Sequence, residues 1–211
     1  MMLYLAGLLF LAGAALAQYT FFSDYRGIGI RGEDGEICLL LSFGVQMINE
    51  NLGKDAPWDT LALSDAVLEG HCATAADKSS SLSARLTHNN RTKALTFDFE
   101  QASVLVDRYQ QLRWLLQVSY IESYQGLSVT FSSSNASSSP PMSGPVKQKF
   151  TCRDNINATL TSPGYEPVRL FFTAPLEIRP YGLSSNIYLC ERTRKRSLSE
   201  SLEMKTTIAS G

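Results

Sequence analysis

Apolar and polar side chains alternate along most of this chain, which is the pattern of a β-strand with one buried face. In residues 82–86 the apolar side chains fall on even positions, and in residues 95–100 they fall on odd positions. A polar turn at residues 88–91 separates the two segments. Together they predict a hairpin that is apolar on one face and polar on the other.

The same period of two predicts further strands. They span residues 37–47, with Cys38 on the face opposite the apolar side chains, and residues 112–120, 127–131, 146–152, 166–173 and 175–180. Helical periodicity is weak, and we expect a few helical turns in residues 60–69. Since strands and helices do not alternate along the chain, the sequence predicts an all-β fold.

Two later segments lack apolar periodicity. Residues 132–145 are rich in serine, proline and glycine. We expect a mobile loop there rather than a linker between two domains, because neither half has enough strands to close on its own. From Glu191 onward the polar composition predicts a disordered tail. The predicted domain therefore spans residues 18–190 and the tail residues 191–211.

The N-terminal segment has the pattern of a targeting sequence. Residues 1–17 are apolar and uncharged and end in the small-x-small triplet Ala15-Leu16-Ala17. Although no lysine or arginine precedes the run, this pattern predicts a cleaved signal peptide. The run is shorter than the ~20 residues that span a bilayer, and no later stretch resembles a membrane span. We expect a protein of the secretory pathway without a transmembrane segment in this chain.

Charge and cysteine content refine this picture. The 19 basic and 20 acidic residues nearly cancel, so composition gives no basis for nucleic-acid binding. An even number of cysteines in an oxidising compartment predicts two disulfides with three possible connectivities, and pairing in chain order closes two loops of about 35 residues. The spacing of the cysteines and of His71 and His88 does not fit a zinc site, and we expect no metal or cofactor. The cysteines are Cys38, Cys72, Cys152 and Cys190.

Three sequons for N-glycosylation support the same compartment. Asn90 lies in the polar turn of the first predicted hairpin, and Asn135 lies in the Ser/Pro segment, so both are expected at the surface. Asn157 falls where a short strand is possible.

Motifs for enzymatic chemistry are weak. Residues 27–32 match Gly-x-Gly-x-x-Gly, but a turn follows where a dinucleotide site needs a helix. His71 precedes Cys72, which we expect to be oxidised, and no serine or carboxylate is marked as a nucleophile or base. The chain is therefore predicted not to be an enzyme, with a hydrolase of unrecognised residues as a minor alternative.

Two further motifs occur near the C-terminus. Residues 192–196 are Arg-Thr-Arg-Lys-Arg, which is typical of a furin-type processing site ending at Arg196, of a solvated basic run, or of the flank of a membrane anchor. Residues 164–168 match the Gly-Tyr-x-x-apolar signal read by cytosolic adaptors. They lie inside the oxidised domain, so we interpret them as the entry to a strand.

With these features in order, the chain resembles the luminal domain of the lysosome-associated membrane glycoprotein (LAMP) family. Residues 38–47 resemble the family's opening strand, in which a cysteine and an apolar run precede Gly-apolar-Gln. Residues 95–99 resemble its Leu-Thr-Phe-x-Phe strand, and residues 150–152 its aromatic-x-Cys segment before a sequon. Cys190 closes the second loop at the family's spacing, and the resemblance covers roughly residues 36–190.

The resemblance implies a β-prism of two antiparallel sheets in which the first cysteine pairs with the second and the third with the fourth. It further implies a non-enzymatic glycosylated domain of endosomes, lysosomes or synaptic vesicles. Such a domain acts as a protective coat, or as a sorting or interaction module for a vesicular membrane protein. The family's transmembrane helix and cytosolic tail do not follow Cys190 here. We therefore expect a truncated or alternatively spliced luminal form, or a secreted relative.

The competing interpretation is a secreted adhesion protein with an immunoglobulin-like β-sandwich, because residues 188–190 match the Tyr-x-Cys of that fold. A bond between Cys72 and Cys152 would favour this alternative, although Trp114 would lie too far from the first cysteine of such a loop.

Overall fold

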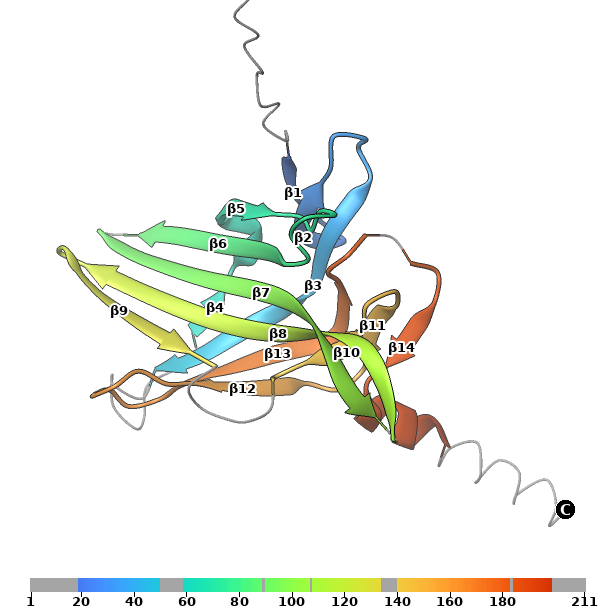
Figure 1. The fold of residues 1–211 in the computed structure, drawn as a ribbon. Helices are drawn as coiled ribbons and strands as arrows, with labels where there is room; N and C mark the ends of the chain where they lie inside the picture. The colour runs from blue at the N-terminus through green and yellow to red at the C-terminus, as the bar shows by residue number, and fades with distance from the viewer. Residues whose placement is uncertain are drawn as a thin grey trace, which may run out of the picture.

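The computed structural model of the protein describes residues 19–49, 59–88, 90–106, 108–133, 140–182 and 184–198. The predicted signal peptide lies outside the described residues. Within them, the strands form one sheet of eight strands and one of six, here called sheet A and sheet B. Figure 1 shows the green and yellow strands of sheet B lying over the gold and orange strands β12 and β13 of sheet A.

Sheet A has the order β1-β2-β3-β13-β11-β14, and β4 and β12 pair with β3 and β13. Its strands are β1 (Thr20–Asp24), β2 (Gly27–Arg31), β3 (Ile37–Asn49), β4 (Asp59–Leu61), β11 (Lys149–Cys152), β12 (Ile156–Leu160), β13 (Val168–Arg179) and β14 (Ile187–Leu189).

Sheet B has the order β10-β8-β7-β6-β5, and β9 pairs with β8. Its strands are β5 (Val67–His71), β6 (Ser80–His88), β7 (Arg91–Val106), β8 (Tyr109–Tyr124), β9 (Leu127–Ser132) and β10 (Ser143–Pro145). The prediction of an all-β fold of two sheets with two disulfides is confirmed. One pair departs from it, because β14 runs parallel to β11, whereas the other pairs in the described residues are antiparallel.

The core lies between the two sheets and is rich in aromatic side chains. Phe43 of β3 and Phe172 of β13 meet Phe97 of β7, with ring centroids 5.6 Å apart for Phe43–Phe97 and 6.3 Å apart for Phe97–Phe172. Trp114 of β8 lies between Phe99 and Phe150 and is fully buried. These contacts are possible because alternate residues of each strand point to one face of its sheet.

Residues 60–69 do not form the expected helical turns. Thr60 instead pairs with Gln46 as part of β4, residues Leu63–Asp65 form a single 3-10 turn, and β5 follows. Leu61 and Leu63, two residues apart, are both buried. That spacing suits an extended chain over a core better than a helix, in which residues three or four apart share a face.

The expected strands 166–173 and 175–180 are one strand, β13. Its pairing with β3 shifts register between Thr173 and Glu177. Pro175 falls inside this bulge, where the ladder does not require a backbone N–H group. The strand therefore continues through a proline that the sequence suggested would end it.

The expected mobile loop 132–145 is partly ordered structure. Residues 134–139, including Asn135, lie outside the described residues, but Ser132 ends β9 and Ser143–Pro145 form β10. Met142 is buried, and its carbonyl oxygen accepts a hydrogen bond from the Leu116 N–H at 3.0 Å. An apolar side chain in the core and a backbone pairing therefore fix the end of a segment whose composition indicated a loop.

The tail also begins differently from the prediction, because residues 191–198 are helical. The Arg194 N–H donates to the Cys190 carbonyl oxygen, and Lys195 Nζ lies 2.6 Å from a carboxylate oxygen of Glu191, four residues earlier. Thr193 is buried against the second disulfide. One docked side chain and a helical ion pair thus order the first part of a polar segment. Residues 199–211 lie outside the described residues.

Candidate functional site

The two disulfides occupy different positions in the fold. Cys38 of β3 is joined to Cys72, which follows β5, so this bond links sheet A to sheet B. Cys152 at the end of β11 is joined to Cys190, which follows β14, so this bond stays at one end of sheet A. The pairing follows chain order.

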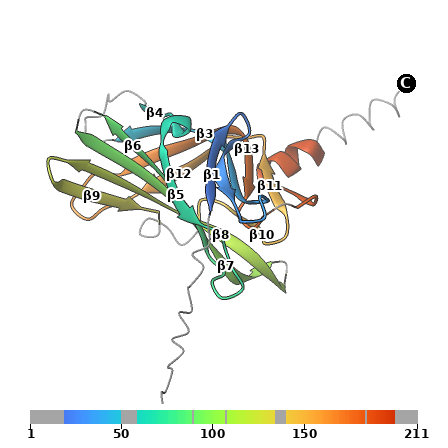
Figure 2. The ribbon, with the colours of Figure 1, turned by 90° about the horizontal axis from the view of Figure 1, so that it is seen from above.

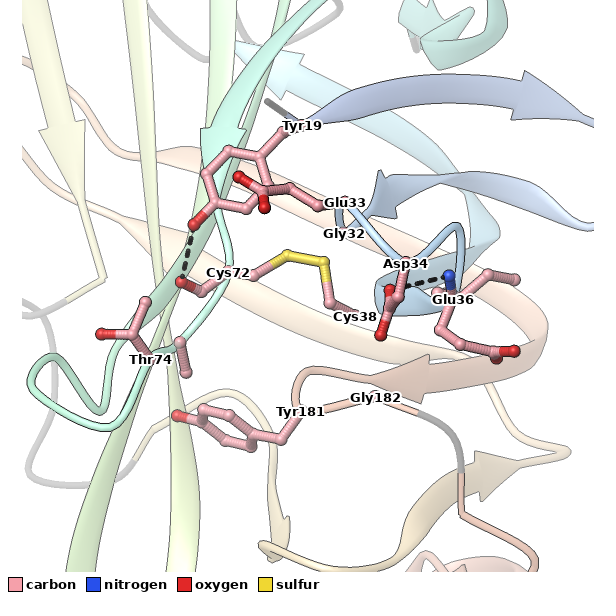
Figure 3. Close-up of a pocket in the computed structure, with 12 residues that line it drawn as sticks. Tyr19, Gly32, Glu33, Asp34, Glu36, Cys38, Cys72, Thr74, Tyr181 and Gly182 are labelled. Carbon is pink, nitrogen blue, oxygen red and sulfur yellow. Dashed lines mark hydrogen bonds between the residues drawn. A yellow bond between two sulfur atoms is a disulfide. The ribbon is translucent and has the colours of Figure 1, made fainter. Parts of the chain in front are cut away.

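A cleft of about 710 Å³ opens beside the Cys38–Cys72 disulfide. In Figure 3 the disulfide crosses the cleft, with the ring of Tyr19 on one side and the ring of Tyr181 on the other. Tyr19 comes from the segment before β1 and Tyr181 from the turn after β13. The cleft is therefore built from parts of the chain that are far apart in sequence and are brought together by the closure of the two sheets.

Both tyrosine hydroxyl groups of the cleft bind the protein's own backbone. Tyr19 Oη donates to the Cys72 carbonyl oxygen at 3.5 Å, and Tyr181 Oη donates to the Phe99 carbonyl oxygen at 2.9 Å. Burial raises the pKa of Tyr181 to about 12, so its phenol stays neutral at physiological pH. These rings serve as fixed walls rather than as acids or bases.

The rim of the cleft is acidic. Glu33, Asp34 and Glu36 lie in the turn between β2 and β3 and line it together. Asp34 Oδ1 accepts a hydrogen bond from the Glu36 N–H at 3.0 Å, which holds the turn in place (Figure 3). No lysine or arginine is among the lining residues described. An acidic rim with aromatic walls suits a cationic segment of a partner.

One group near this cleft contains the residue types of a hydrolase. His71 Nε2 lies 3.3 Å from Ser79 Oγ, and Ser79 Oγ donates to Asp77 Oδ1 at 2.7 Å. In a catalytic triad the carboxylate orients the histidine at its other ring nitrogen. Here Asp77 lies 3.7 Å from the same Nε2, and the hydrogen bonds from Ser79 lower its pKa. The group stabilises a turn and does not form a relay.

A second cluster lies at the Cys152–Cys190 disulfide. The ligand atoms of Cys152, Asp154 and Cys190 lie within 4.8 Å of one another, but both sulfur atoms are used by the disulfide, so no thiolate is present to bind a metal. The cluster instead fixes the helix that follows. Thr193 Oγ1 donates to Asp154 Oδ2 at 3.0 Å and accepts from the Arg153 N–H at 2.9 Å.

The sequon asparagines that the structure describes are both exposed. Asn90 lies in the turn between β6 and β7 with a positive φ of 60°. Asn157 lies on β12, which pairs with β13 at one edge. Their glycosylation remains a prediction.

The other sequence motifs take ordinary structural roles. Gly27 to Gly32 form β2 and the start of a turn, as the strand-and-bend interpretation expected. Tyr165 lies before β13, half exposed and in edge contact with Phe131. Arg196 forms an ion pair with Asp154 from within the C-terminal helix. In the described part of the chain, no helix has the length and apolar character needed to cross a membrane.

Sequence reasoning found the cysteines but missed the cleft residues around them. Nothing in the sequence connects Tyr19 with Tyr181, because their proximity depends on the order of strands in sheet A. The acidic turn after residues 27–32 was recognised as a turn, and its position beside the disulfide follows from the pairing of β2 with β3.

The fold that carries these features is a two-sheet, disulfide-linked β-prism of the LAMP type. The chain is similar to the crystal structure of the membrane-proximal domain of mouse lysosome-associated membrane protein 1, with a TM-score of 0.51 and 13% sequence identity. The similarity covers 84% of this chain and 99% of the mouse domain. No family model matches the sequence, and no curated protein matches it. This fold and the two disulfides are consistent with a secretory or extracellular location.

Proposed function

We propose that this protein is a non-enzymatic, glycosylated LAMP-like luminal domain that acts in the endosomal, lysosomal or synaptic-vesicle system. Its role is to recognise or sort another protein, such as a vesicular membrane protein, or to coat the membrane. The observation that carries the proposal is the fold, which matches the mouse domain over nearly its whole length. The predicted signal peptide and sequons support the same compartment.

The cleft beside the Cys38–Cys72 disulfide is the recognition surface of this proposal. Its walls are fixed by hydrogen bonds to the backbone, and its rim carries carboxylates. A rigid acidic cleft binds a basic segment of a partner with little loss of its own conformational entropy. This arrangement favours binding over chemistry.

The experiment that tests the location is expression of an internally tagged copy in secretory cells. The proposal expects the tag in endosomal, lysosomal or synaptic vesicles, with a mobility that shifts after removal of N-glycans. Accumulation in the medium alone would contradict it. That result would favour the second candidate, a secreted recognition or adhesion protein.

The role of the cleft is tested by the double variant Asp34→Asn/Glu36→Gln, which removes two rim charges and keeps the side-chain shapes. We expect this variant to change its vesicular localisation while its export from the endoplasmic reticulum stays normal. The control is Asp65→Asn/Glu69→Gln, which removes two exposed charges outside the lining of the cleft. If both variants localise as the wild type does, the rim is not used for sorting.

A further inference from the structure

Strands β7 and β8 extend well beyond the rest of sheet B as a two-stranded ribbon. β6 pairs with β7 from Arg91 to Phe99, and β10 pairs with β8 from Arg113 to Leu115. Past these points β7 and β8 pair with each other as far as Val106 and Tyr109. Figures 1 and 2 show this end of the hairpin projecting from the body of the molecule.

The hydrogen bonds of the neighbouring segments show which backbone groups face outward. The Leu112 carbonyl oxygen accepts a hydrogen bond from the Val146 N–H, and the Leu116 N–H donates to the Met142 carbonyl oxygen. The backbone N–H and C=O groups of even-numbered residues of β8 therefore point away from β7. The backbone N–H and C=O groups of odd-numbered residues of β8 point toward β7, and these residues lie opposite even-numbered residues of β7.

The backbone N–H and C=O groups of odd-numbered residues of β7 therefore point away from β8. The Phe99 carbonyl oxygen agrees, because it accepts its hydrogen bond from Tyr181 on that outer side. Beyond Phe99, the outward N–H and C=O groups belong to Gln101, Ser103 and Leu105. In the described part of the chain, no hydrogen bond reaches these backbone groups.

The ribbon exposes two leucine side chains to solvent. Odd-numbered residues of β7 lie opposite even-numbered residues of β8, so Leu105 and Leu112 lie on the same face of sheet B as Trp114. They continue this face past the region that sheet A covers. Their side chains are 71% and 54% exposed. Residues 101–106 contain no charged side chain, whereas exposed edge strands usually carry charges or prolines that prevent pairing.

We propose that two copies of this protein associate through this edge, with β7 of one copy pairing antiparallel with β7 of the other across a two-fold axis at Ser103. Ser103 then faces Ser103 of the second copy, and Gln101 faces Leu105 in both directions. Each of these three residue pairs exchanges two backbone hydrogen bonds. Leu105 of each copy then lies beside Gln101 of the other copy, next to the end of the core face that sheet A covers.

A second copy fits this edge for three reasons. The outward positions Gln101, Ser103 and Leu105 are evenly spaced, so a two-fold axis at Ser103 pairs all three, as an isologous interface requires. The absence of charge in residues 101–106 removes like-charge repulsion between identical strands. The small serine at the axis lets the two backbones approach. Pairing of this short edge buries less surface than a standard interface of ~1,600 Å². We therefore expect the dimer to form in a concentration-dependent manner.

The first test measures the mass of the purified, glycosylated protein in solution over a range of concentrations. We expect the mass to rise from that of a monomer to twice that value. Ser103→Pro removes an outward N–H without touching the β7–β8 ladder, and Leu105→Lys adds charge at the edge. Both variants are expected to remain monomeric and folded, whereas Leu127→Lys, at an equally exposed leucine of β9, should dimerise.

The second test uses a cross-link at the axis. Opposed residues of antiparallel strands lie within the Cα separation that a disulfide needs. With oxidised glutathione as the oxidant, Ser103→Cys should give a covalent dimer, whereas the exposed serine variant Ser128→Cys should not. A wild-type protein that stays monomeric at every concentration, or a dimer unaffected by Ser103→Pro and Leu105→Lys, overturns the proposal. The first result would leave the ribbon as a site for a different protein.

Discussion

Thr193 connects the start of the C-terminal helix to the second disulfide. Its buried hydroxyl group donates to Asp154, accepts from the Arg153 N–H and lies 3.1 Å from the sulfur of Cys190. A single hydroxyl group thus binds two polar groups in a part-buried environment. Such groups are expensive to leave without a partner.

We therefore expect Thr193→Val, which keeps the side-chain shape, to lower the free energy of unfolding by about 1–3 kcal/mol. Denaturant unfolding measures the change. The control Thr130→Val, at an exposed position of β9, should change stability by no more than about 0.5 kcal/mol. Equal effects of the two variants would show that the hydroxyl network does not stabilise the fold.

Tyr181 makes stability depend on pH at the alkaline end. Burial raises its pKa in the folded protein to about 12, above the ordinary value of 10.0. The phenol therefore contributes stability that is fully present below pH 10, and this contribution is lost as the pH rises through 12. Denaturant unfolding at a series of alkaline pH values should show this loss.

In Tyr181→Phe that part of the pH dependence should disappear, even though loss of the hydrogen bond to Phe99 lowers the stability at neutral pH. Tyr25→Phe is the control, because Tyr25 is 95% exposed. A pH profile unchanged by Tyr181→Phe would mean that another group causes the alkaline loss.

At the scale of elements, β10 is held in place by its fit against β8. A Cβ atom added at Gly144 would lie 2.9 Å from the six-membered ring of Trp114, which is fully buried and cannot move aside. Glycine is therefore required by the close approach of a short strand to an indole ring. The glycine of this segment, whose composition suggested a loop, is the residue that allows the pairing.

Gly144→Ala is expected to cost about 1–3 kcal/mol of stability by overpacking. Trp114→Phe removes the part of the ring that a new methyl group would meet, so Gly144→Ala should cost less in that background. A double-mutant cycle of unfolding free energies measures this coupling. Additive effects would show that the strain at Gly144→Ala does not come from Trp114.

The two disulfides differ in their access to solvent. The Cys38–Cys72 bond lines the cleft and Cys38 is half-buried, whereas Cys152 and Cys190 are 1% and 7% exposed beneath the C-terminal helix. Thiol–disulfide exchange requires the attacking thiolate to reach a sulfur atom. The bond between the sheets is therefore the more accessible one.

Under limiting reductant in native buffer, we expect Cys38 and Cys72 to be alkylated before Cys152 and Cys190. Peptide mass spectrometry of the alkylated protein measures the order. In Thr193→Val, whose helix is less firmly docked, the second pair should react faster while the first keeps its rate. Simultaneous reaction of all four cysteines would indicate that reduction occurs only after global unfolding.

At the scale of the whole molecule, the strands were predictable wherever one face is buried throughout. Residues 37–47, 95–100 and 114–120 show the period of two because the two sheets cover their inner faces. Leu112 continues the pattern at an exposed position. Residues 60–69 and 143–145 were not predictable, because β4 and β10 depend on pairing with β3 and β8. Local sequence contains no trace of those partners.

The candidate site divides in the same way. Cys38 and Cys72 were recognised, since cysteines in an oxidising compartment predict their own chemistry. The tyrosine walls and the acidic rim form a site only through the order of strands in sheet A, which brings β1, β2, β3 and β13 side by side. The helix at residues 191–198 likewise depends on a tertiary contact of Thr193 that composition does not reveal.

The bond between the sheets also determines how the domain responds to mechanical force. When the two ends of the domain are pulled apart, the tension passes through both disulfides and bypasses the loops they close. Those loops span sequence separations of 34 and 38 residues, and each withholds roughly 110–140 Å of chain from extension at about 3.3–3.6 Å per residue. The strands outside these loops, β1, β2 and β6 to β11, would bear the load, while most of sheet A stayed inside the closed loops.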